Sequence, residues 1–92
     1  MERKMKLSAD YVIQPLVDEY LVIPIGEAGK RFRGVIRMNA TGAFMWNAIR
    51  NGADTKEKIL AEVRKAYEDA DMEKAEEDLN RFLDTIQMAL EE

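Results

Sequence analysis

The chain has 92 residues, 47% of them hydrophobic and 35% charged, which suffices for one small domain with a single core. It contains no cysteine and no histidine, so disulfide bonds, thiolate nucleophiles, sulfur-ligated metals and imidazole bases are all excluded. The net charge of −4 is uneven: residues 1–53 carry eight basic against five acidic side chains, and residues 54–92 carry six against thirteen. The second half would repel a polyanion such as nucleic acid.

Hydrophobic segments that direct proteins to membranes are missing from the sequence. No apolar run approaches the roughly 20 residues needed to cross a bilayer, and residues 1–6 lack the apolar core of a signal peptide. We therefore expect a cytoplasmic protein without membrane association. It should form one domain over residues 1–92, with a flexible start over residues 1–7.

Two short apolar runs near the start predict a β-hairpin. Tyr11–Leu16 and Glu19–Ile25 are rich in β-branched and aromatic residues and are joined by a short connection. Pro15 cannot donate a ladder hydrogen bond, which places the first strand at a sheet edge, and we place Pro24 at the end of the second strand. Residues 26–34 contain three glycines and predict a solvated loop with three basic side chains, Lys30, Arg31 and Arg33.

The spacing of the apolar residues changes within residues 34–49, as expected where a strand runs directly into a helix. Val35–Met38 is a short run with the β-branched residues that suit a strand. Asn39 or Thr41 can cap the following helix, because either side chain can accept a hydrogen bond from a free backbone N–H. One helix face is then marked by apolar residues at three- and four-residue steps, Phe44, Met45, Ala48 and Ile49.

The remaining sequence predicts two further helices. Gly52 can end the first helix, and the capping-box spacing of Asp54 and Glu57 predicts the start of the second. Asp71 can cap the third helix, over about Met72–Leu90, whose apolar stripe is wider than the roughly 100° needed to dock on one core. Three antiparallel strands followed by three helices predict an α+β fold of the winged helix-turn-helix type.

No set of side chains in the sequence fits a catalytic or metal site. Ser8 is the only serine, and there is no histidine to activate it. Asp69, Asp71 and Glu73 alternate like calcium-loop ligands, but the sixth and twelfth loop positions lack the required glycine and acid. We therefore expect no enzymatic activity, no metal and no cofactor.

Binding of a partner molecule is the function that the sequence pattern then supports. A three-stranded sheet has two edges with unpaired backbone groups, and Val35–Met38 carries no proline to block one of them. An extended peptide can add there as a fourth strand and pack against the spare apolar face of the last helix. The predicted contact residues are Val35, Ile36, Arg37, Met38, Leu79, Phe82, Leu83 and Ile86, with possible electrostatic contacts from Lys30, Arg31 and Arg33.

The stretch Met38–Trp46 resembles the hydrophobic–Asn–x–Thr–Gly–x–x–hydrophobic–Trp signature of PqqD-like proteins, the RiPP recognition elements. Tyr20–Pro24 and Thr55–Ile59 are similar to the second strand and the second-helix start of that family. The similarity as a whole spans about residues 8–90. The resemblance implies a domain that binds the leader of a ribosomally made precursor peptide and presents it to a tailoring enzyme, often a radical S-adenosylmethionine protein. Asn39, Thr41, Gly42 and Trp46 match the signature, and physically they suit a cap, a turn and a core.

Two other functions fit the same order of elements. A winged-helix DNA-binding domain needs a basic recognition helix, whereas residues 71–92 contain two basic and eight acidic side chains. A homodimerising structural module would pair the free edge with a second copy of itself. The acidic last helix argues against nucleic acid as the partner.

Overall fold

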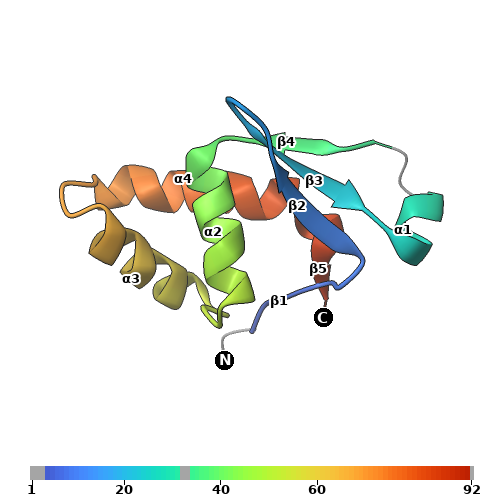
Figure 1. Ribbon diagram of the computed structural model, residues 1–92. Helices are drawn as coiled ribbons and strands as arrows, with labels where there is room; N and C mark the ends of the chain where they lie inside the picture. The colour runs from blue at the N-terminus through green and yellow to red at the C-terminus, as the bar shows by residue number, and fades with distance from the viewer. Residues whose placement is uncertain (1–3, 32–33, 92) are drawn as a thin grey trace.

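The computed structural model describes residues 4–31 and 34–91, and its central element is a three-stranded antiparallel sheet (Figure 1). The strands lie in the order β2 (Tyr11–Pro15), β3 (Tyr20–Pro24) and β4 (Ile36–Met38). The three strands expected from the sequence are therefore confirmed, each slightly shorter than expected. Because β3 is central, β2 and β4 are the two edges of this sheet.

Alternation of side chains explains how the sheet attaches to the rest of the molecule. On β4, Ile36 and Met38 are buried and Arg37 between them is exposed, as a strand with one covered face requires. On β3, Val22 lies opposite Ile36 in the register and is completely buried. One face of the sheet therefore packs on the helices and contributes to the core.

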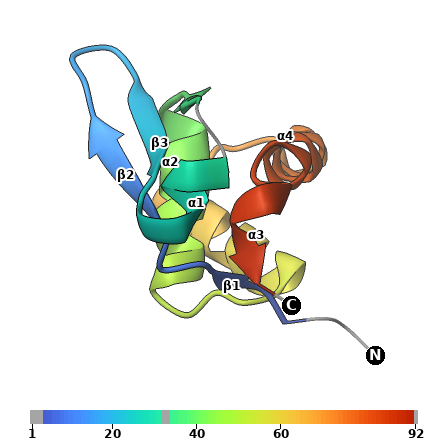
Figure 2. The ribbon, with the colours of Figure 1, turned by 90° about the vertical axis from the view of Figure 1, so that its right-hand side faces the viewer.

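Three helices follow the sheet: α2 (Ala40–Arg50), α3 (Lys56–Ala66) and α4 (Met72–Thr85). In Figure 2, β2 and β3 lie on one side of α2 and α4 lies on the other, so α2 is the middle layer. The largest completely buried side chains come from β3, the three helices and the residue after α4, and they belong to one cluster: Val22, Met45, Trp46, Ile59, Leu79 and Ile86. The expected α+β architecture is thus observed.

Two of the predicted helix caps are found. The Asn39 side chain accepts a hydrogen bond from the Gly42 backbone N–H at 2.8 Å and starts α2. The carboxylate of Asp71 accepts hydrogen bonds from the backbone N–H groups of Glu73 and Lys74 and starts α4. Both caps fix the residue at which a connection turns into a helix.

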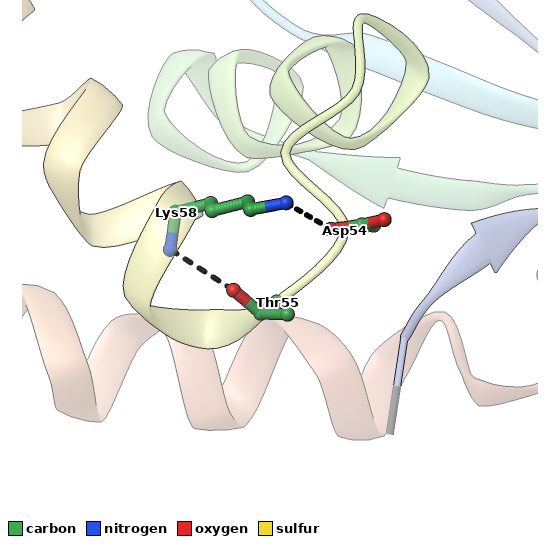
Figure 3. A network of polar contacts seen from close by, with 3 residues as sticks. All are labelled: Asp54, Thr55 and Lys58. Atoms are coloured by element: carbon green, nitrogen blue, oxygen red, sulfur yellow. Dashed lines mark hydrogen bonds and ion pairs between the residues drawn. The ribbon is translucent and has the colours of Figure 1, made fainter. Parts of the chain in front are cut away.

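The cap predicted for the second helix is wrong by one residue. Thr55, with an extended backbone, caps α3 by accepting a hydrogen bond from the Lys58 N–H at 3.2 Å (Figure 3). The Asp54 carboxylate instead binds the Lys58 ammonium group at 3.0 Å. That hydrogen bond lowers the pKa of Asp54 below its ordinary value. The spacing of acids therefore indicated the helix start but not the capping group.

A loop was predicted over residues 26–34, and residues 26–31 differ from it. Gly26–Arg31 form a short helix, α1, whose first residue, Gly26, has a positive φ of 57°. Ala28 is only 2% exposed, so α1 is held by packing one small side chain into the core. The sequence interpretation missed this contact because the three glycines of the segment suggested a loop.

The two ends of the chain also differ from the prediction. Instead of continuing to Leu90, α4 stops at Thr85, and a 3₁₀ turn, Gln87–Ala89, leads into the short strand β5 (Leu90–Glu91). This strand pairs with β1 (Lys6–Leu7), within the stretch that was expected to be flexible. Within residues 4–31 and 34–91, each helix is too short or too polar to cross a lipid bilayer.

Candidate functional site

A cavity of about 210 Å³ lies between the edge strand β4, the first turns of α2 and the second half of α4. We call it the β4 groove. Met38 and Phe82, at 9% and 7% exposure, and the completely buried Met45 give it an apolar lining. Its other lining residues are polar or small: Arg37, Asn39, Thr41, Gly42, Asp78, Arg81 and Thr85.

Gly42 explains why α2 and β4 approach each other so closely at this groove. A Cβ atom at Gly42 would lie 3.1 Å from the Cβ of Met38, which is tighter than ordinary van der Waals contact. The signature stretch therefore builds the junction: Asn39 caps the helix, Gly42 permits the approach, and Trp46 is completely buried in the core. Asn39, Thr41 and Gly42 also line the groove, which the sequence interpretation did not anticipate.

The backbone of β4 borders this groove with an edge that is available for pairing. Among the described residues, β4 pairs with β3 alone, through Ile36, Arg37 and Met38. In an antiparallel ladder, alternate residues direct their N–H and C=O groups away from the partner strand. In the part of the chain that the structure describes, the outward groups of β4 therefore remain unpaired beside the β4 groove, as strand addition requires.

The residues predicted on the third strand differ in their placement. Val35 precedes β4 and is 47% exposed. Ile36 points into the core, and Met38 lies between the core and the groove. Arg37 is the outward residue, and its Nε atom lies 3.7 Å from a Glu19 carboxylate oxygen.

The last helix divides between core and groove. Phe82 lines the groove, and Leu83 is half-buried against the core. Leu79 and Ile86, which the sequence placed at the peptide contact, are completely buried and do not line the β4 groove. Their side chains are occupied in holding α4 onto the sheet and the other helices.

Sequence reasoning missed the polar wall that α4 contributes to the groove. Asp78, Arg81 and Thr85 follow helical spacing around Phe82, so all four side chains share one face of α4. The sequence did contain a signal for this wall, because these polar residues lie three or four positions apart next to the apolar Phe82.

The charged groups near the groove are mostly exposed. The Arg37 side chain is 76% exposed, and the Arg81 side chain, 3.9 Å from the Asp78 carboxylate, is 78% exposed. Lys30 pairs with Glu27 within α1, at the end of the molecule opposite α3 in Figure 1. Arg31 ends α1 and is exposed, and the predicted contact Arg33 lies outside the described residues. Arg37 and Arg81 are therefore the cations that line the groove.

The fold and the groove define a class of small α+β domain with an open sheet edge beside a partly apolar groove. The family model for coenzyme PQQ synthesis protein D (PqqD) matches residues 19–89, and the chain belongs to this family. The resemblance seen in Met38–Trp46 is thereby confirmed.

A solved structure, TbiB1 in complex with the TbiA(beta) leader peptide, has a similar fold. Its TM-score is 0.69 over 94% of both chains, with 23% sequence identity. No curated protein is significantly similar to this chain. Among the described residues, no cluster of three or more Asp and Glu side chains could hold a metal ion.

Proposed function

We propose that this protein is a non-catalytic module that captures the leader segment of a ribosomally synthesised precursor peptide. The observation that carries the proposal is the position of the β4 groove directly beside the unpaired edge of β4. Membership of the PqqD family supports it. So does the similar fold of TbiB1, which was solved with a leader peptide bound.

In this proposal the leader adds to β4 as a fourth strand of the sheet. Main-chain hydrogen bonds to the outward groups of β4 supply affinity that depends little on sequence. Alternate side chains of the leader point toward the groove, where Met38 and Phe82 offer an apolar contact. An apolar cavity of about 150 Å³ admits a benzene ring, so the β4 groove can take one side chain of leucine or phenylalanine size. Burying such a side chain contributes about 1.5–3 kcal/mol.

The chemistry then belongs to a separate tailoring enzyme, which we propose is a radical S-adenosylmethionine maturase. Iron–sulfur clusters are held by cysteine thiolates, and this chain has no cysteine. It also has no histidine for acid–base work. The protein would thus supply substrate recognition in the cytoplasm, where the precursor is made, and the partner would supply the reaction.

A titration with the leader segment encoded next to this gene tests the proposal. In ¹⁵N NMR spectra we expect the largest amide shifts at Ile36–Met38 and at Arg81–Thr85, with a micromolar or lower Kd. Shifts confined to β2, or no binding to any precursor encoded nearby, would contradict it. Light scattering during the same titration should show a 1:1 complex, and a dimer that forms without peptide would favour a homodimerising module instead.

A further inference from the structure

A second cavity, of about 460 Å³, lies at the other end of α4. It is formed by the connection between α3 and α4, the end of α3 and the first turns of α4, and we call it the α3–α4 cavity. Thr41, Met45 and Asp78 line both this cavity and the β4 groove. The two spaces therefore adjoin along one side of α4.

The spacing of the two cavities suits an extended peptide. On α4, the β4 groove is lined from Asp78 to Thr85 and the α3–α4 cavity from Asp71 to Asp78, a displacement of seven positions. At a rise of about 1.5 Å per helical residue, the displacement is about 10 Å. A strand advances about 3.3 Å per residue, so about three residues of an extended peptide cover this distance.

The charges of the two cavities are opposite. The β4 groove has Arg37 and Arg81 against Asp78, whereas the α3–α4 cavity has one cation, Lys74, against four carboxylates, Glu68, Asp69, Asp71 and Asp78. Asp71 is occupied as the α4 cap and Asp78 lies near Arg81. Within the described part of the chain, Glu68 and Asp69 have neither a hydrogen bond nor an ion pair from their side chains.

The α3–α4 cavity also has apolar lining residues. Tyr67 is 47% exposed, and its ring is fixed edge-on against Phe44, with 5.4 Å between the ring centroids. Met45, Val63, Ala70 and Ala75 also contribute to the apolar lining. A lysine or arginine fits such a place, because its aliphatic stem can cover the apolar wall while its cation reaches the acidic rim.

We propose that the peptide-binding site extends past β4 into the α3–α4 cavity, which takes a lysine or arginine of the same bound peptide. This basic residue lies about three residues from the side chain held in the β4 groove. The ligand is thus recognised by an apolar anchor, acidic residues that suit Arg37 and Arg81, and a basic residue at a set distance. The inference rests on the proposed function, because it places the same peptide along α4.

Selection from a displayed library of random 15-residue peptides tests this inference on the full chain. We expect the selected peptides to share an apolar residue with a lysine or arginine about three positions away. For one selected peptide, the double variant Glu68→Lys, Asp69→Lys should weaken binding about tenfold at low salt, since two attractions become repulsions. At 0.5 M salt the loss should shrink, because these charges are exposed to solvent.

A matched double variant, Asp18→Lys with Glu76→Lys, changes the net charge equally at exposed positions outside both cavities. It should leave the Kd within twofold of the original. Selected peptides that shift the Ile36–Met38 amides but lack a basic residue, or equal losses in both double variants, overturn the extended site and leave the proposed function standing. Peptides that fail to shift the Ile36–Met38 amides overturn both.

Discussion

The two edges of the sheet differ in what the chain does with them. At β2, Pro15 lacks a backbone N–H, and the Arg50 side chain donates to the Tyr11 carbonyl at 3.4 Å. Among the described residues, β4 pairs with only one strand, β3, and the β4 groove lies beside β4. An edge strand is a liability unless it is blocked or used. The protein blocks one edge and keeps the other beside a cavity.

The wall behind β4 is the first place to test that difference, because α4 must be fixed for the groove to exist. Leu79 is completely buried, so Leu79→Ala should destabilise the fold by about 2–5 kcal/mol in urea unfolding. Leu83 is half-buried, and Leu83→Ala should cost about 1 kcal/mol or less. Similar losses from the two substitutions would mean that Leu79 is not more deeply packed in the core than Leu83, contrary to the structure.

Filling the groove should remove binding at β4 without unfolding the protein. Thr85 is exposed and lines the groove, so Thr85→Trp places a large ring where the leader side chain would sit. We expect the affinity for the leader to fall about 100-fold, equivalent to about 2.7 kcal/mol. Asn80→Trp, at an exposed α4 position outside the groove, is the control and should bind normally in calorimetry. Equal effects of both would place the peptide elsewhere on the protein.

The cations of the groove should have a smaller, salt-dependent effect. Arg81→Glu should weaken binding of a leader with acidic residues about three- to tenfold at low salt, because the Arg81 side chain is largely exposed. Lys30→Glu, on α1 outside the groove, should change the affinity less than twofold. A loss at Lys30 as large as that at Arg81 would extend the contact to the basic segment, as the sequence suggested.

The smallest effect is expected far from both edges, at the start of α3. Because the Lys58 hydrogen bond lowers the pKa of Asp54, Lys58→Met should return that pKa toward its ordinary value. The stabilisation from this contact is present above the ordinary pKa of an aspartate, about 3.9, and is lost as the pH falls through the lowered value. NMR titration of the Asp54 carboxyl group measures the shift. Leader binding near pH 7 should stay unchanged, and a change would link α3 to the groove.

Local patterns in the sequence predicted much of the fold and only part of the site. Asn39 and Trp46 were correctly interpreted as cap and core. Gly42, expected in a turn, instead lies within α2, where it permits the close approach to Met38. The separation of Leu79 from Phe82 could not be predicted, since it depends on how α4 packs against the sheet. The β1–β5 pairing could not be predicted either, because it joins two-residue strands from opposite ends of the chain.

Amide hydrogen exchange with and without the leader peptide tests the difference between the two edges most directly. If the leader adds to β4, the outward-facing N–H groups within Ile36–Met38 should exchange at least about tenfold more slowly in the complex, and those of β2 should be unchanged. Protection that appears along Tyr11–Pro15, or a complex that forms with no added protection at Ile36–Met38, would contradict strand addition at the open edge.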